Sequence, residues 1–338
     1  ALLDRSEAPS GGTEVGLYLL GNWPSPFAIV LVLDRLSALM LLLTAIVAVA
    51  SQVYAGDGQD TAGPQFQALF QFQLLGINDA FLTGDLFNLF VFFEVLLIAF
   101  YTLLLHGLGP QRVGAAVHVV VLNLIGSALF LFAVGTLYGV TGTLNLADLA
   151  RVIPQLDADA APLARSGALL LLGVFALKAA LLPLGFWLPR SYAAALGATA
   201  ALFAVLTKVG VYAILRVFPL AFGPEAGELA GVASPWVLPA ALATLAFGAL
   251  GVLAARALRE AAGWLVVYSV GTLLVEPEGR NTGPAIVQLE QAGVAIHQPA
   301  EQVVVIGDVA VEEQEVRIER GCRPRADPDL LRVCGKCE

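Results

Sequence analysis

Long apolar stretches alternate with short polar stretches rich in glycine and proline along the first 274 residues. A helix needs about 20 apolar residues to cross the hydrocarbon core of a bilayer. The pattern predicts seven complete spans, at residues 27–50, 66–83, 86–105, 113–140, 167–182, 199–220 and 236–255. An eighth apolar run begins at residue 262 and stops at 274, which is too short to cross. We therefore expect an all-α integral membrane protein built as a multi-helix bundle.

Composition agrees with a membrane location. The chain has 338 residues, of which 58% are hydrophobic and 13% charged, and its mean hydropathy is +0.80. Soluble globular domains carry about 25% charged residues. The net charge of −9 argues against a nucleic-acid partner, since proteins that bind nucleic acids present basic surfaces.

The charged residues divide the chain into three parts. Residues 1–26 form a polar N-terminal segment, and residues 27–274 form the membrane domain. Residues 275–338 carry a mixed, charged pattern that is typical of a soluble segment. We expect this short tail to be unrelated to the membrane domain.

All three cysteines lie in that tail. Cys334 and Cys337 have the spacing of a metal or redox pair, and Cys322 is a candidate third ligand. A zinc site usually needs four ligands, and only His297 remains. We therefore expect no metal site and no cofactor.

Ionisable residues inside apolar runs are the strongest functional signal. The chain contains only three lysines, and Lys178 and Lys208 both lie within predicted spans. Glu94 is a third such group, in the run 86–105. A charge at the centre of a bilayer costs about 2.5–3.5 kcal/mol, so such a residue is by default a functional-site hypothesis. Two buried cations and one buried anion indicate proton handling.

Structural explanations for these residues stay open. A lysine can extend its ammonium group to the membrane interface, and Glu94 can be a neutral carboxyl, because desolvation favours the uncharged form. If Glu94 and Lys178 approach each other, their protonation states become coupled. Tyr212 lies one turn after Lys208 and is spaced to hydrogen-bond it. His118, one turn into a span, is either a satisfied polar group or a member of a relay.

Proline and glycine follow Lys178 closely. Pro183 removes a backbone donor five residues after the lysine, and Gly185 and Pro189 add further breaks. Irregular backbone at membrane depth is tolerated only where it is buried in protein or lines a cavity, and broken helices mark the ion sites of many secondary transporters. We therefore expect a broken helix near Pro183.

Several motifs resemble one family. Asp85-Leu-Phe-Asn-Leu-Phe-Val-Phe-Phe-Glu94 and Phe175-Ala-Leu-Lys-Ala-Ala-Leu-Leu-Pro-Leu184 are similar to the D-type subunit of the multisubunit Mrp cation/proton antiporter. The match continues through residues 66–76, 121–130, 138–149 and 207–216, and it covers about residues 15–274. The Mrp family is similar in turn to the antiporter-like membrane subunits of respiratory complex I, NADH:quinone oxidoreductase.

The resemblance implies a multi-pass subunit of the cell (inner) membrane, with inverted repeats and a proton path. In the family a glutamate and a lysine on neighbouring helices and a further lysine form that path, and Glu94, Lys178 and Lys208 occupy the matching positions. The implied function is exchange of Na⁺ or another monovalent cation for protons. The implied partners are the other membrane subunits of a hetero-oligomeric complex.

Two alternatives accompany this hypothesis. The first is a proton-pumping membrane subunit of NADH:quinone oxidoreductase. The second is a truncated or joined, non-functional fragment, because the family has further helices before residue 27 and a second repeat after residue 274. The expected architecture is accordingly a truncated inverted-repeat antiporter. Gly185 also stands where the family is expected to have a larger side chain.

Overall fold

The computed structural model describes residues 15–22, 29–61, 63–107 and 109–279. Most of the tail 275–338, including the three cysteines and His297, lies outside these residues. In chain order the long helices are α1 (Arg35–Ala55), α2 (Phe66–Leu82), α3 (Leu86–Leu105), α4 (Pro110–Thr141), α6 (Ala161–Ala179), α8 (Gly197–Ala221), α9 (Ser234–Ala254) and α10 (Leu258–Gly279). The short helices are α5 (Leu146–Val152) and α7 (Trp187–Ala194), with 3₁₀ turns η1 (Leu20–Asn22), η2 (Ile153–Gln155) and η3 (Gly227–Leu229).

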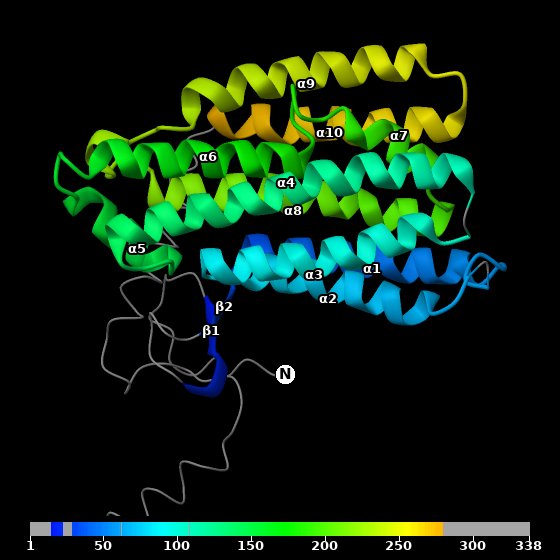
Figure 1. Ribbon diagram of the computed structural model, residues 1–338, viewed down its shortest axis with the longest axis horizontal. Coiled ribbons are helices and arrows are strands. Elements are labelled where there is room, and N and C mark those ends of the chain that lie inside the picture. Colours follow the sequence, from blue (N-terminus) through cyan, green and yellow to red (C-terminus); the bar gives the residue numbers. More distant parts are fainter. Residues whose placement is uncertain (1–14, 23–28, 62, 108, 280–338) are drawn as a thin grey trace, which may run out of the picture.

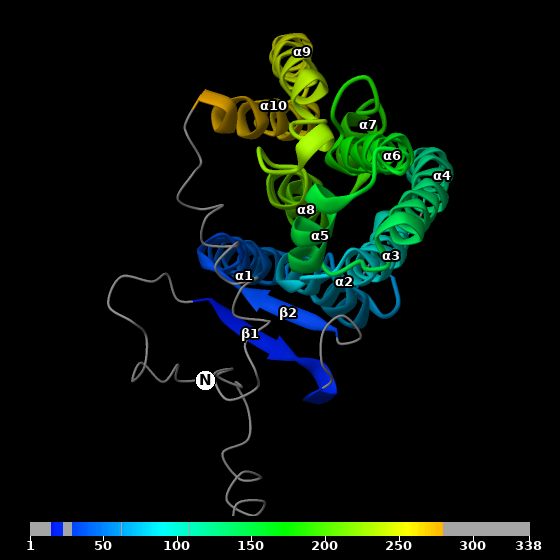
Figure 2. The same ribbon diagram turned by 90° about the vertical axis from the view of Figure 1, so that its left-hand side faces the viewer.

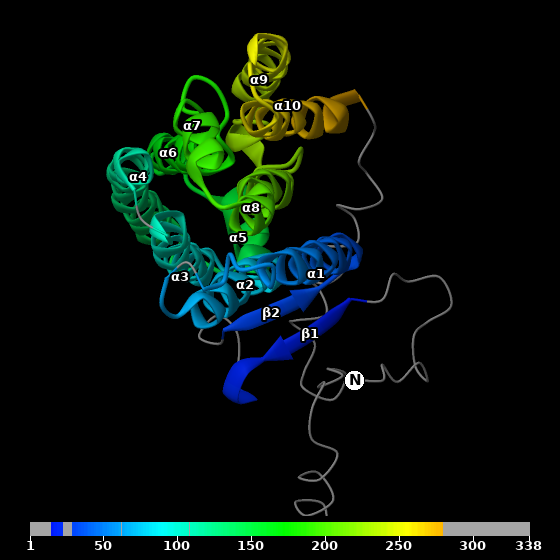
Figure 3. The same cartoon turned by 90° about the vertical axis from the view of Figure 1, so that its right-hand side faces the viewer.

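The long helices lie side by side along one direction (Figure 1). Seven helices of the described part are long and apolar enough to cross a membrane, and they include every long helix except α2, which has 17 residues. Viewed from the two ends, α1, α2, α3, α4 and α6 form an arc around α8, while α9 and α10 lie on the opposite side from α1 (Figures 2 and 3). The fold is therefore mostly a bundle of membrane helices.

Helix α8 is the centre of the bundle. Its apolar window is 72% buried, against 22% for α1 and for the window that includes α9. Gly210 permits its closest approach to α6, because a Cβ at that position would lie 2.5 Å from the backbone nitrogen of Ala179. Small residues let membrane helices pack backbone against backbone. Lys208 and Arg216 are thus carried by the most enclosed helix.

The first span differs from the prediction. It begins at Arg35, because Val30–Leu33 is a strand, β2, that pairs antiparallel with β1, Gly16–Leu19. Asp34 starts the helix with a capping box: its carboxylate accepts from the Ser37 backbone N–H, and the Ser37 hydroxyl accepts from the Asp34 N–H. Four apolar residues of a strand were therefore counted as membrane helix, since hydrophobicity alone does not separate the two.

The eighth span was predicted too short. Helix α10 begins at Leu258, and residues Leu258–Val275 are long enough to cross. The prediction began only at residue 262 because Arg259 and Glu260 are charged, but both lie in the first helical turn. There the Glu260 carboxylate accepts from the Arg256 backbone N–H. An acidic side chain at a helix start satisfies free N–H groups and suits the positive end of the helix.

The expected break after Lys178 is present, and it comes earlier than Pro183. Helix α6 ends at Ala179, Ala180 adopts a left-handed conformation with φ of 60°, and α7 begins at Trp187. The Leu182 N–H, which has no helical partner, donates to the Thr244 hydroxyl of α9 at 2.8 Å. Gly185 fits this turn, since a Cβ there would lie 2.2 Å from the Ala180 carbonyl oxygen. A larger side chain at residue 185 would require a different turn.

Candidate functional site

Three polar side chains from three helices meet inside the bundle. Ser127 of α4 lies between Glu94 of α3 and Lys178 of α6. The Ser127 hydroxyl donates a hydrogen bond to Glu94 Oε1, and the Lys178 ammonium donates to Ser127 Oγ at 3.3 Å. Lys178 is only 1% exposed. The structure thus brings Glu94 and Lys178 together through a hydroxyl group that the sequence analysis did not identify.

Aromatic rings surround this contact. Phe93, Phe130 and Phe175 are buried, and their ring centroids lie 5.4–6.5 Å apart. The Lys178 Nζ lies 5.6 Å from the centroid of the Phe93 ring, which is a cation–π distance. Charges interact more strongly in such an apolar environment than in water. The half-buried Glu94 carboxyl group and the buried Lys178 ammonium group therefore face each other across a largely apolar environment.

Local sequence sets the positions of these groups. Asp85 caps α3 by accepting from the backbone N–H groups of Phe87 and Asn88, which fixes where the helix that carries Glu94 starts. Gly126, next to Ser127, leaves room for Leu177: a Cβ at residue 126 would lie 2.6 Å from Leu177 Cδ2. A larger residue at position 126 would therefore require the Leu177 side chain to move.

Lys208 lies in a separate polar contact. Its ammonium donates to Ser269 Oγ of α10 at 2.5 Å, and the Ser269 hydroxyl in turn donates to the Val266 carbonyl oxygen. Within the part of the chain that the structure describes, no chain of hydrogen bonds joins Lys208 to Lys178. The two sites are adjacent through the backbone, because Gly210, two residues after Lys208, contacts α6 at Lys178 and Ala179.

The supporting residues have other surroundings than expected. His118 is exposed on α4, so the structure does not bring it to the site. The Tyr212 hydroxyl donates to the Phe81 carbonyl oxygen at 2.7 Å and accepts from Arg216, so its hydrogen-bond partners here are these two groups and not Lys208. Pro183 lies in the turn between α6 and α7.

In the described ranges, no group of three or more His, Cys, Asp or Glu side chains could hold a metal ion.

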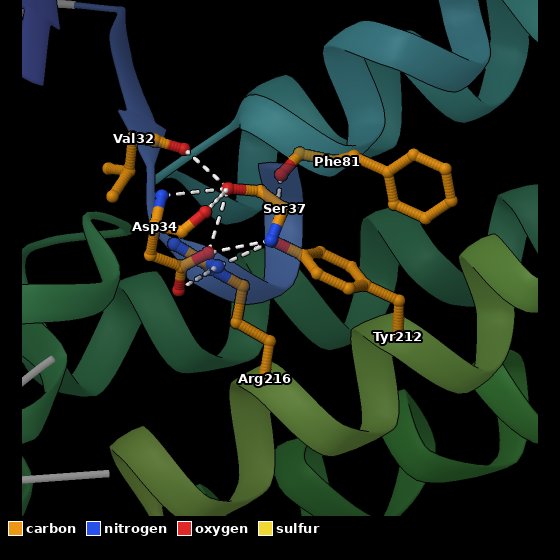
Figure 4. A network of polar contacts seen from close by, with 6 residues as sticks. All are labelled: Val32, Asp34, Ser37, Phe81, Tyr212 and Arg216. Atoms are coloured by element: carbon orange, nitrogen blue, oxygen red, sulfur yellow. Dashed lines mark hydrogen bonds and ion pairs between the residues drawn. The ribbon is translucent and has the colours of Figure 1, made fainter. Parts of the chain in front are cut away.

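An ion pair that the sequence analysis missed joins α8 to the start of α1. Arg216 Nη1 lies 3.0 Å from Asp34 Oδ2, and the side chains are 3% and 13% exposed. Figure 4 shows this pair with Ser37, Tyr212 and the carbonyl groups of Val32 and Phe81. Burial alone would raise the pKa of the Asp34 carboxyl, but the Arg216 guanidinium and the hydrogen bonds from Ser37 hold that pKa below its ordinary value.

The fold and the Glu94–Ser127–Lys178 contact between α3, α4 and α6 define a multi-pass membrane protein with ionisable groups paired between its helices. Residues 83–276 match the family described as "NADH:quinone oxidoreductase/Mrp antiporter, TM". The chain belongs to this family, and the predicted resemblance to the D-type subunit of Mrp antiporters is confirmed.

Relatives with higher sequence identity support the similarity to D-type antiporter subunits. The chain is 53% identical over 259 residues to the D-type subunit of a probable K(+)/H(+) antiporter of Rhizobium meliloti, in a match that covers 77% of the chain and 48% of the relative. It is 40% identical to the D-type subunit of a Na(+)/H(+) antiporter of Alkalihalophilus pseudofirmus, covering 76% of the chain and 51% of the relative. The chain thus spans about half the length of these relatives.

Solved structures give the same result. A chain of the Mrp complex from Dietzia sp. superposes with a TM-score of 0.71 and 30% identity, covering 84% of this chain and 53% of the other. A chain of respiratory complex I from Thermus thermophilus gives a TM-score of 0.61 and 28% identity, covering 77% and 54%.

Proposed function

We propose that this chain acts as the D-type subunit of a multisubunit monovalent cation/proton antiporter and conducts protons through Glu94, Lys178 and Lys208. The observation that carries the proposal is the hydrogen-bonded contact of Glu94 with Lys178 through Ser127. Two oppositely charged titrating groups that interact in an apolar interior bind protons as a coupled pair. The names of two relatives, which are subunits of a K(+)/H(+) and a Na(+)/H(+) antiporter, support exchange of a monovalent cation for protons.

In this proposal, protonation of Glu94 is the first step. The proton removes the negative charge that stabilises the ammonium of Lys178, so Lys178 releases a proton more readily. Lys208 next receives the proton that Lys178 releases. Movement at the α6–α8 contact around Gly210 allows this transfer. Loss of that proton toward one face of the membrane is coupled to cation entry from the same face, so that the two ions move in opposite directions. Transfer of the Glu94 proton to the neutral Lys178 then resets the pair.

The break between α6 and α7 supports the same proposal. Discontinuous helices allow side chains and backbone to line an ion path at membrane depth. We place the centre of one antiporter repeat at this break. The partners in the proposal are the other membrane subunits of the complex, which provide the remainder of the path.

Charge-neutral variants test the relay. In membrane vesicles that contain the assembled complex, Glu94→Gln and Lys178→Ala should abolish exchange of Na⁺ and of K⁺ for protons, measured with a pH-sensitive dye. Glu94→Asp should keep part of the activity, since the carboxylate remains but is one methylene shorter. Both cations are tested because the two relatives are named for different ones.

Glu225→Gln is the matched control, because Glu225 is exposed in the loop before η3. It should leave exchange unchanged. Subunit assembly is measured on the same preparations. Full exchange in Glu94→Gln, or a loss of assembly that parallels the loss of exchange, would contradict the relay.

A second candidate is a membrane subunit of an NADH:quinone oxidoreductase. The superposition on a chain of respiratory complex I favours it, although with a lower TM-score than the Mrp chain. Purification of the chain with its native partners separates the two functions. Proton transport that requires NADH and quinone would favour the oxidoreductase, and exchange driven by an imposed cation gradient alone would favour the antiporter.

A further inference from the structure

We propose that Ser127 transfers the proton between Lys178 and Glu94. The inference rests on the proposed antiporter function and assigns a third chemical group to the same site. Its basis is the position of the hydroxyl: it is the one group that hydrogen-bonds both Lys178 and Glu94 among the described residues. Ser127 is itself buried, at 7% exposed.

The chemistry of the three groups fits a transfer in series. An ammonium group only donates hydrogen bonds and a carboxylate only accepts them, whereas a hydroxyl does both. In the structure Ser127 accepts from Lys178 and donates to Glu94, so both hydrogens point from the lysine toward the glutamate. A hydroxyl in this arrangement can pass on a proton without keeping a charge.

The transfer balances as follows. The Lys178 Nζ–H bond breaks as a new O–H bond forms on Ser127 Oγ, and the original Ser127 O–H bond breaks as an O–H bond forms on Glu94 Oε1. The products are a neutral amine and a neutral carboxylic acid, with the hydroxyl restored. Its hydrogen now points toward the amine, so the reverse transfer follows the same path. No water or other reactant is consumed.

The other hydroxyls of the long helices provide a contrast. Serine and threonine in helices commonly donate to the carbonyl oxygen one turn back in their own helix. Thr44, Thr102, Thr136, Ser166 and Thr244 all do so at 2.6–2.9 Å. Ser127 instead donates across to α3. Its hydrogen is therefore available to the relay rather than to its own backbone.

Substitutions of the hydroxyl test the proposal. Exchange is measured in vesicles that contain the assembled complex, and assembly is checked on the same samples. Ser127→Ala removes the hydroxyl, and we expect at least about a ten-fold slower exchange with normal assembly, since a positioned proton-transfer group contributes roughly 10²–10⁴-fold. Ser127→Thr keeps the hydroxyl and should retain most of the rate. Thr136→Ala, which removes a half-exposed hydroxyl that donates to the Phe132 carbonyl oxygen of the same helix, should have no effect.

The outcomes separate this inference from the proposed function. Unchanged exchange in Ser127→Ala, together with abolished exchange in Glu94→Gln, would overturn the serine relay and leave the antiporter proposal intact. Exchange that persists in Glu94→Gln would overturn the antiporter relay itself. If Ser127→Ala does not assemble, Ser127→Cys, which nearly keeps the size and has a weak donor, is measured instead. If Ser127→Cys exchanges at the wild-type rate, as Ser127→Thr is expected nearly to do, the hydroxyl is not needed and the inference is overturned.

Discussion

At the scale of single residues, rarity decided what the sequence could predict. Lysine seldom occurs in an apolar span, so the sequence alone identifies Lys178 and Lys208 as site candidates. It does not identify Ser127 and Ser269, which contact these lysines. Hydroxyl residues are common in membrane helices and usually bond their own backbone, so their sequence context does not indicate a special role.

Gln73 is a buried polar residue that, unlike Lys178 and Lys208, has no hydrogen-bond partner for its side chain among the described residues. It lies in α2 with no exposed surface, and within the described part of the chain neither its Oε1 nor its Nε2 has a hydrogen-bond partner. A buried polar group without a partner costs about 1–3 kcal/mol, and replacement by an apolar group of similar shape removes that cost.

Gln73→Leu should therefore raise the free energy of unfolding by about 1 kcal/mol. Thermal unfolding in detergent micelles measures the change. Gln71→Leu, at an exposed position of the same helix, is the control and should change stability by less than about 0.5 kcal/mol. A destabilised Gln73→Leu variant would show that the amide has a partner that matters.

At the scale of elements, helix type was predictable and helix ends were not. The wrong starts at residues 27 and 262 have one cause: hydrophobicity does not separate an apolar strand from a helix, nor a charged first turn from a loop. The early end of α6 has another. Contacts from other helices surround this end: the Thr244 hydroxyl of α9, Gly210 of α8, and the Trp187 indole of α7, which donates to the Leu177 carbonyl oxygen.

The hydrogen bond from Leu182 to Thr244 should stabilise the break. Thr244→Val keeps the shape of the side chain but leaves the Leu182 N–H without its acceptor, so the free energy of unfolding should fall by about 1–3 kcal/mol. Thr244→Ser keeps the acceptor and should lose less. Thermal unfolding measures both. Equal losses in the two variants would mean that packing, and not the hydrogen bond, holds the turn.

At the scale of the whole molecule, the Asp34–Arg216 pair connects the start of α1 and the adjoining strand β2 to the central helix. Loss of one partner of a buried ion pair leaves an unpaired charge and typically costs about 3–5 kcal/mol. Asp34→Asn should destabilise the fold on that scale. Asp148→Asn is the control, because its pair with Arg151 is far more exposed and such pairs contribute about 0–1 kcal/mol. Similar losses in both variants would contradict a structural role for the buried pair.

The same pair predicts a pH dependence. The Asp34 carboxyl has a pKa below its ordinary value in the folded protein, so the folded state favours its ionised form. Its stabilising contribution is therefore present above the unfolded pKa of about 4 and is lost as the pH falls through the folded pKa. The difference in unfolding temperature between wild type and Asp34→Asn should shrink below about pH 4. A difference that stays constant down to about pH 2 would contradict this assignment.

The end of α6 inside the bundle has an electrostatic consequence of its own. Peptide dipoles add along a helix and leave about half a negative elementary charge at its C-terminus, where a cation gains about 0.3–1 kcal/mol. Lys178 lies in the last turn of α6, one residue before the helix ends. This partial charge belongs to the backbone, so no proton can neutralise it. The ammonium of Lys178 consequently keeps a favourable field even while Glu94 is protonated, and no side-chain substitution removes that field as long as α6 ends at Ala179.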